Sequence, residues 1–179
     1  MILVIVKPCD KRQDGSAVAR ETLFVALSER FSLPRTEIKK TEAGKPYFED
    51  ERYPAFSISH TEGAICVAMS DSAESVGVDI EKYSDRLQNN RLTDRFFPSL
   101  TAGENEISDI ALLTEADVCI EENTDIVFTL GEAIIKCDGG GFAIAQRASE
   151  LSQNMKKASF KLTASSGAYA LSIAIKERK

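Results

Sequence analysis

The first part of the chain alternates apolar runs with polar turns, and the periods of these runs predict one helix among short strands. Residues 2–6 form a continuous apolar run that predicts a buried first strand. After a polar loop, Ser16 can cap a helix whose apolar positions recur at helical spacing to about Phe31. The helix is expected to end before Pro34, because proline cannot continue it. Residues 37–48 predict short strands around a turn.

A β-hairpin and a further strand follow. Two apolar runs, residues 56–60 and 64–69, are separated by Thr61-Glu62-Gly63, which is typical of a hairpin. After a turn, residues 76–81 predict another strand. The rest of the chain predicts helices and a closing hairpin. The predicted helices are residues 88–97, a short helix opened by a capping box at Thr101–Glu104, residues 124–138 and residues 143–154, and the closing strands are residues 158–163 and 168–176.

The closing hairpin resembles the first one in sequence. Residues 56–69 and 160–173 share a leading phenylalanine, a Gly-Ala pair and the same apolar phase. Two ordinary hairpins can also look alike by chance, but the shared features favour an internal repeat. The chain is then an α+β protein with a pseudo-two-fold duplication of two similar lobes, residues 1–97 and 98–179. Each lobe is expected to pack a helix on a small antiparallel sheet, and a ligand is expected in the cleft between them.

Composition narrows the classes of partner and compartment. The net charge of −6 disfavours general binding to nucleic acid or to an anionic membrane. The four cysteines form no C-x-x-C pair and there is one histidine, so a zinc site is not expected. They are interpreted as reduced thiols of a cytoplasmic protein. We expect neither a signal peptide nor a membrane span, because no apolar run is long enough.

Asp79 and Glu81 stand out because they lie two residues apart in an otherwise apolar strand. Residues at this spacing point to the same face of a strand, about 7 Å apart. Two like charges there repel each other unless something neutralises them, and a hard divalent cation such as Mg²⁺ prefers carboxylate oxygens. The alternative is a strand end whose acids reach solvent.

Glu132 and Lys136 are a second pair, one helical turn apart in the predicted helix 124–138. They could form a surface ion pair, or they could face a site. For Glu132 there is a further alternative, because Thr129-Leu-Gly-Glu132 also fits a capping box in which the glutamate bonds back to the cap.

Four segments in order resemble the 4′-phosphopantetheinyl transferases, specifically the two-lobed, surfactin-synthetase type. They are Gly44-Lys45-Pro46, Ser59-His60, Gly77-Val-Asp79-Ile-Glu81 and Phe128-Thr-Leu-Gly-Glu132-Ala-Ile-Ile-Lys136. Membership would imply transfer of the phosphopantetheine arm of coenzyme A to a serine of an apo acyl or peptidyl carrier protein. Mg²⁺ or Mn²⁺ would be needed, and adenosine 3′,5′-bisphosphate would leave. Metal and lysine would together neutralise the pyrophosphate.

The resemblance also implies roles for individual residues. Asp79, Glu81 and Glu132 would hold the metal. Glu132 would also accept the proton of the incoming serine, and Lys136 would hold a coenzyme A phosphate beside it. The other residues implied to contact coenzyme A are Arg20, Lys45, Ser59 and His60; each has an ordinary structural alternative, such as an exposed helix arginine or a lone strand histidine.

The chain departs from the family pattern at Gly131, where the family has a lysine. This removes a cation expected near the phosphates and costs about 1 kcal/mol of helix stability relative to alanine. The acidic segment 101–127 is an ordinary solvated face, or it should repel an acidic carrier helix. In that case docking would rely on other surfaces, for example one with Arg86, Arg91 and Arg95. A degenerate, non-catalytic family member that binds coenzyme A or a carrier is therefore the second hypothesis. A plain α+β interaction module is the third.

Overall fold

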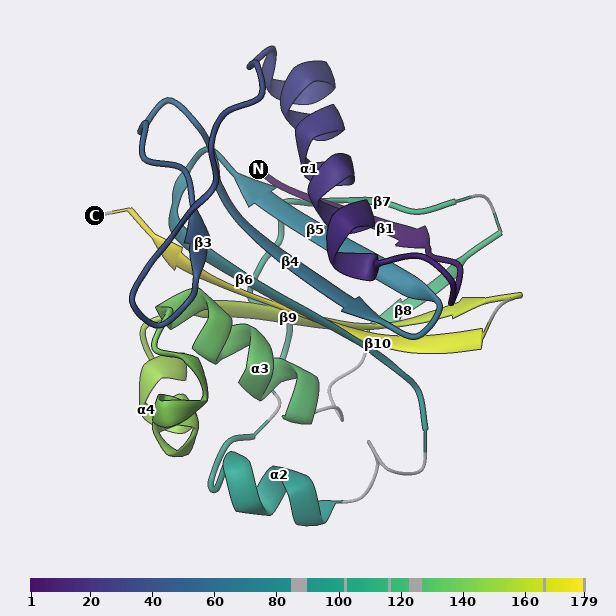
Figure 1. Cartoon of the computed structure of the whole chain (residues 1–179). Helices are drawn as coiled ribbons and strands as arrows, with labels where there is room; N and C mark the ends of the chain where they lie inside the picture. Colours follow the sequence, from purple (N-terminus) through teal and green to yellow (C-terminus); the bar gives the residue numbers. More distant parts are fainter. Residues whose placement is uncertain (85–89, 102, 116, 123–126, 166, 179) are drawn as a thin grey trace.

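The computed structural model describes residues 1–84, 90–101, 103–115, 117–122, 127–165 and 167–178, with the backbone alone at 90 and 91. Figure 1 shows two groups of strands, with α1 above them and α3 below them in that view. The elements, in chain order, are β1 (Ile2–Pro8), α1 (Gly15–Phe31), β2 (Lys39–Lys40), β3 (Pro46–Tyr47), β4 (Ala55–Thr61), β5 (Ala64–Ser70), β6 (Ala73–Lys82), α2 (Asn90–Phe96), β7 (Ile110–Leu113), β8 (Cys119–Glu122), α3 (Val127–Asp138), the 3₁₀ helix η1 (Gly141–Arg147), α4 (Ala148–Ser152), β9 (Lys156–Ala164) and β10 (Gly167–Glu177).

The predicted first helix is confirmed, but its cap is not the predicted residue. Asp14, rather than Ser16, is the N-cap of α1, and its carboxylate accepts a hydrogen bond from the Ser16 N–H. An aspartate is as good a cap as a serine, so the pattern alone did not separate the two. Ser32 ends the helix in the left-handed conformation. The hydroxyl of Ser16 is therefore free for another role.

The strands form two four-stranded sheets and one two-stranded arm. The first sheet has the order β4-β5-β1-β7, and the second has the order β6-β10-β9-β8. The described part of the chain is thus an α+β protein, as predicted. The first sheet is mixed and not antiparallel as expected, because β7 pairs with β1 in parallel. The arm is β2 paired with β3.

Two strands were missed and one predicted helix is absent. The strands β7 and β8 are only four residues long, and neither shows a strict alternation of apolar and polar positions. The capping box expected at Thr101–Glu104 opens no helix in residues 101 and 103–109. The predicted helix 143–154 is instead η1 followed by α4. No helix among the described residues has the length and apolar character needed to cross a bilayer.

The two sheets pack face to face around the largest apolar core. Val4 of β1, Val78 of β6 and Leu171 of β10 are among its fully buried members. Burying one such side chain contributes about 2 kcal/mol relative to leaving it exposed. The outer faces of the sheets are covered separately, because α1 packs on the first sheet and α3 on the second. The alternating residues of β6 consequently face the core on one side and α3 on the other.

The two sheets meet along β4 and β6 through side-chain hydroxyls. The oxygens of Ser57, Ser59 and Thr61 on β4 accept hydrogen bonds from the backbone N–H groups of Val78, Ile80 and Lys82 on β6, at 3.1, 3.4 and 3.4 Å. Buried backbone donors need such partners. The period-two hydroxyls of β4 thus fix the position of β6, which carries Asp79 and Glu81.

Two sets of elements follow a similar order along the chain, once β2 and β3 in the first and α2, β7, β8, η1 and α4 in the second are set aside. The order strand, helix, hairpin describes β1, α1, β4 and β5, and again β6, α3, β9 and β10. In both units the second hairpin strand lies beside the first strand. The glycine shared by the two hairpins does not have the same place in both. Gly63 lies in the turn between the paired residues Thr61 and Ala64, whereas Gly167 is itself paired with Ala164. The sheets also do not divide at residue 97, since β6 belongs to the second sheet and β7 to the first.

Candidate metal centre

Asp79 and Glu81 share the outer face of β6 with Gly77, while Val78 and Ile80 face the core. Gly77 allows close approach of α3. A Cβ at this position would lie 2.0 Å from the carbonyl oxygen of Ala133. The helix backbone therefore lies directly on the strand, and the side chains of α3 reach the two acids. The Gly-x-Asp-x-Glu pattern is one continuous strand face.

Helix α3 supplies Glu132 and Lys136, one turn apart. The helix begins at Val127, so Thr129 lies inside it and is not an N-cap. The capping-box alternative for Glu132 is therefore excluded. The surface-pair alternative also fails, because Lys136 Nζ lies 2.6 Å from Asp79 Oδ1.

Three carboxylates lie close together where α3 packs on β6. One ligand oxygen from each of Asp79, Glu81 and Glu132 lies within 4.8 Å of the others. We call these three residues the carboxylate cluster. Its members come from β6 and from a helix about 50 positions later in the chain. Two elements that are distant in sequence are thus needed to build it.

Asp79 is held in place by a small polar network. Its side chain is almost fully buried, with 1% of the residue exposed. Ser59 donates a hydrogen bond to Asp79 Oδ1 at 2.8 Å, and Lys136 donates to Ser59 Oγ at 3.0 Å. Thr61 donates to Glu81 Oε2 at 3.1 Å. The serine and threonine hydroxyls thus orient the acids and join β4 to β6 at the same time.

Crowding of the carboxylates changes their acidity. Burial, and then the negative charge of Asp79, raises the pKa of Glu132 to about 7. The same two causes raise the pKa of Glu81. Both effects act against the ionised form. A glutamate with a pKa near neutrality is suited to accept a proton during a reaction.

The cluster offers the ligands that a hard divalent cation prefers. Mg²⁺ and Mn²⁺ take carboxylate oxygens, and Mg²⁺ is commonly bound by a few carboxylates plus substrate phosphates. Asp79 Oδ2 is buried and has no hydrogen-bond partner among the described residues. An unpaired, buried carboxylate oxygen is costly unless a cation or a proton satisfies it. The donor set therefore fits Mg²⁺ or Mn²⁺.

Two adjoining clefts lead to the cluster. The smaller one, about 210 Å³, is lined by the cluster itself together with Ser59 and His60. The larger one, about 440 Å³, extends between α1, the β2–β3 arm and the C-terminal end of α3. Both clefts share Ser16, Ile58, Glu132 and Lys136, so we treat them as one main cleft. Three further basic residues line its larger part: Arg20, Lys40 and Lys45.

All five residues predicted to contact coenzyme A, namely Arg20, Lys45, Ser59, His60 and Lys136, line the main cleft. Arg20 and His60 line the main cleft from α1 and β4. The imidazole Nε2 of His60 lies 3.1 Å from Ser16 Oγ, within hydrogen-bond distance. Ser59 is buried, and its hydroxyl is engaged by the Asp79 network. Lys45 is half-buried, and its ammonium donates a hydrogen bond to the Cys137 carbonyl at 2.5 Å.

Gly131 does not leave a gap in the main cleft. Its backbone is buried on the side of α3 that faces Phe97, and a Cβ would lie 2.5 Å from the Phe97 ring. A lysine at this position would enter the apolar core between α2 and α3. A side chain at this position would thus point to Phe97, and Gly131 is not among the residues that line the main cleft. The glycine makes room for an aromatic ring.

The acidic segment is solvated where the structure describes it. Glu104, Glu115, Asp117, Glu121 and Glu122 are exposed. Of the predicted docking arginines, Arg95 is exposed and its guanidinium lies over the Phe96 ring. Arg86, Asp125 and the side chain of Arg91 lie outside the described residues.

Four functional features were not predicted from the sequence. Lys40 and the exposed Phe142 line the main cleft, Ser16 contacts His60, and Gly77 lets α3 approach the strand. Of these, only the role of Gly77 could have been predicted from the sequence, because a glycine inside a strand often marks the close approach of another backbone. The others are brought to the cleft by elements that are far apart in sequence.

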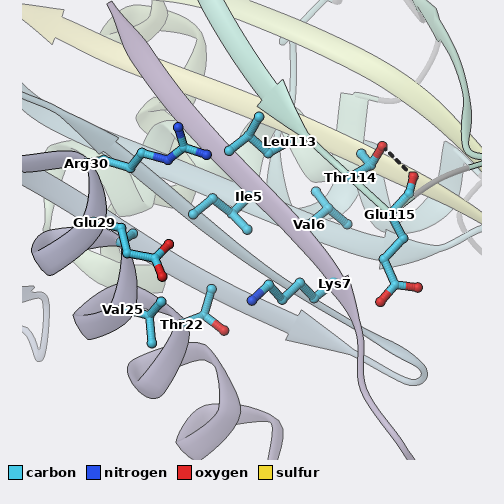
Figure 2. A pocket seen from close by; sticks show the side chains of 11 residues that line it. Ile5, Val6, Lys7, Thr22, Val25, Glu29, Arg30, Leu113, Thr114 and Glu115 are labelled. Atoms are coloured by element: carbon cyan, nitrogen blue, oxygen red, sulfur yellow. Dashed lines mark hydrogen bonds between the residues drawn. The ribbon is translucent and has the colours of Figure 1, made fainter.

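A second cleft, of about 180 Å³, lies on the other side of α1. Figure 2 shows side chains from α1, from β1 and from the end of β7 around it. Its charged residues are of both signs, with Lys7 and Arg30 beside Glu29 and Glu115. None of the predicted site residues lines it. The predicted site residues line the main cleft instead.

Comparison with known proteins gives no assignment. No model of a known protein family matches the chain, and no curated protein matches it.

Proposed function

We propose that the chain is a metal-dependent 4′-phosphopantetheinyl transferase that loads an apo acyl or peptidyl carrier protein. The observation that carries the proposal is the convergence of Asp79, Glu81 and Glu132 within 4.8 Å, beside Lys136, at one end of a cleft lined by basic residues. A carboxylate cluster next to cations is what a pyrophosphate substrate with a divalent ion requires.

Roles for the cluster follow from its geometry. Asp79, Glu81 and Glu132 would hold Mg²⁺ or Mn²⁺, which would neutralise charge on the pyrophosphate of coenzyme A. Glu132 would also take the proton from the carrier serine, directly or through water. The serine oxygen bonds to the phosphorus that bears the pantetheine arm, and the bond to the second phosphate breaks. Adenosine 3′,5′-bisphosphate is the leaving group.

The main cleft provides the surface for coenzyme A. Lys136 lies at its junction with the cluster, where it can contact the pyrophosphate. Arg20 and Lys40 line the larger part, where they can meet the remaining phosphate. His60 lies near the cluster end. The substrate would thus run from the cluster toward the β2–β3 arm.

The proposal includes the pseudo-two-fold duplication of the fold. The shared order of strands in the two units supports it. Because one chain supplies every cluster residue, no second copy is needed and we expect a monomer. We expect a cytoplasmic protein, since the four cysteines are unpaired.

The test is a carrier-loading assay read by mass spectrometry. Wild-type protein, coenzyme A and Mg²⁺ are incubated with several apo acyl and peptidyl carriers. We expect a mass gain of one phosphopantetheine arm on at least one carrier. The gain should disappear in Asp79→Asn, which keeps the shape of the buried side chain but removes its charge. Glu29→Gln, a change in the second cleft, is the matched control.

The outcomes separate the hypotheses. Loading that depends on Asp79 supports the transferase. Coenzyme A binding that depends on Mg²⁺, without loading of any carrier, would favour the non-catalytic family member. If neither coenzyme A nor Mg²⁺ stabilises the protein against heat, both hypotheses fail and an interaction module remains.

A further inference from the structure

Lys45 makes a contact that its expected role does not explain. Its ammonium donates hydrogen bonds to the carbonyl of Cys137, at 2.5 Å, and to the hydroxyl of Ser75. Ser75 Oγ donates to the same carbonyl at 2.6 Å. Three elements therefore meet at one point: the β2–β3 arm, strand β6 and the C-terminal turn of α3.

Burial of this lysine has a cost that the contact offsets. Burial lowers the pKa of Lys45, because desolvation disfavours the charged form. The C-terminal carbonyls of a helix carry partial negative charge, and a cation placed there stabilises the helix end. Lys45 thus directs two of its three N–H donors to oxygens of the protein itself.

The surroundings of α3 are shaped around the lysine stem. Gly139 ends the helix with a φ of +91°, in the left-handed region. A Cβ on Gly139 would lie 3.0 Å from Lys45 Cδ. The glycine thus permits both the helix end and the close passage of the lysine.

The end of α3 controls the cluster residues. Cys137 directly follows Lys136 and lies five positions after Glu132, which is about 7.5 Å along a helix. A displacement of the Cys137 carbonyl therefore displaces the two side chains that face Asp79. The same contact ties down the arm that forms one wall of the main cleft.

We propose that Lys45 is a positioning residue: it binds the C-terminal end of α3 and holds Glu132 and Lys136 against β6, and it is not a ligand of the substrate. The experiment below has two measurements, and only the second, the affinity for Mn²⁺, rests on the proposed function. The first concerns the helix itself and needs neither metal nor substrate.

The experiment compares Lys45→Met, which keeps the apolar stem, with the wild type. The first measurement is amide hydrogen exchange in the peptide 132–138 of the full chain. Exchange is expected to be faster in the variant, because the helix end opens more readily. The second is Mn²⁺ affinity without any nucleotide, expected to fall roughly tenfold, as for other groups that orient metal ligands. Lys7→Met, a change of an exposed lysine in the second cleft, should change neither.

Ser75→Ala provides a second variant that retains the lysine. It should change both measurements in the same direction and by less, and it keeps the inference testable if Lys45→Met does not fold. Unchanged exchange in 132–138 would overturn the inference. Faster exchange with unchanged Mn²⁺ affinity would also overturn it, because Lys45 would then stabilise the helix without positioning the cluster.

If Lys45→Met instead weakens only the binding of adenosine 3′,5′-bisphosphate, Lys45 is a phosphate ligand. Failure of the wild type to bind Mn²⁺ would reject the proposed function, and the exchange data would still decide whether Lys45 holds α3.

Discussion

At the scale of single residues, Glu132 combines two opposed properties. It completes the carboxylate cluster, and its ionised form is disfavoured by burial and by Asp79. Lys136 neutralises part of this charge through its ion pair with Asp79. A residue that is unfavourable for the metal-free protein but suited to bind a cation is typical of a functional site.

Glu132→Gln should therefore change stability and metal affinity in opposite directions. At about pH 8, above its pKa, Glu132 is ionised, and replacing it removes repulsion within the cluster. We expect a higher melting temperature without metal and Mn²⁺ affinity reduced by roughly one to two orders of magnitude, because a ligand is lost. Thermal denaturation and calorimetric titration measure the two effects. Glu29→Gln should alter neither, and unchanged Mn²⁺ affinity in Glu132→Gln would reject its role as a ligand.

The four residues that meet at the cluster, Asp79, Glu81, Glu132 and Lys136, were all singled out from the sequence. Asp79 and Glu81 are two positions apart on a strand, and Glu132 and Lys136 are one turn apart on a helix, so local periodicity placed each pair on one face. The hydroxyls of Ser57 and Thr61 were not assigned a role. Their partners are on β6, and no local pattern reveals which strand edges meet.

At the scale of elements, the approach of α3 to β6 depends on Gly77. We expect Gly77→Ala to destabilise the protein by about 3 kcal/mol, at the upper end for overpacking, because the new Cβ would meet helix backbone rather than a movable side chain. Urea denaturation gives the change in the free energy of unfolding. Gly103→Ala is the matched control, since nothing lies within 4 Å of its Cβ position. A Gly77→Ala protein as stable as the control would contradict the close packing.

If Gly131 replaced a phosphate-binding lysine, restoring the lysine should raise activity. The packing of Gly131 against Phe97 predicts the opposite. Gly131→Lys should not raise carrier loading; it should destabilise the protein by about 3 kcal/mol or more, because a charged chain would enter an apolar core. A coupling test adds Phe97→Ala. Removing the ring should make Gly131→Ala less harmful than in the wild type, with an interaction energy of about 1 kcal/mol. Additive effects, or increased loading by Gly131→Lys, would show that the two positions do not share this space.

The elements with strong periodicity were predicted correctly, and those that depend on distant partners were not. Helix α1 and the β4–β5 hairpin carry their pattern within a short segment. The strand β7 forms by pairing in parallel with the edge of β1. Nothing in the sequence of residues 110–113 indicates this partner. The capping box before it satisfied a local rule without a helix to follow.

At the scale of the whole molecule, the main cleft is lined by residues of α1 and β4 and by residues of α3, so segments from both halves of the chain form it. The α+β class and the facing helices follow from the order of the elements. The exchange of β6 and β7 between the sheets could not be predicted, because it depends on which edges remain unpaired after each hairpin has formed. This exchange brings the acids of β6 to the boundary between the units. Ser59 and Thr61 of the first unit bind these acids, so the site as it stands depends on both units.

The pH dependence of stability should report on the assembled cluster. The pKa of Glu132 is about 7 in the folded protein, against an ordinary value of 4.5 in an unfolded chain, and the pKa of Glu81 is also raised. The folded state therefore binds more protons than the unfolded state between these values, so stability falls as pH rises through the window. Without metal, the melting temperature should decline from about pH 5 to about pH 8. Saturating Mg²⁺ should reduce the decline, because the ion favours the ionised cluster, and Glu132→Gln should reduce it without metal. A metal-free wild type whose stability is flat over this range would contradict the close approach of the three carboxylates.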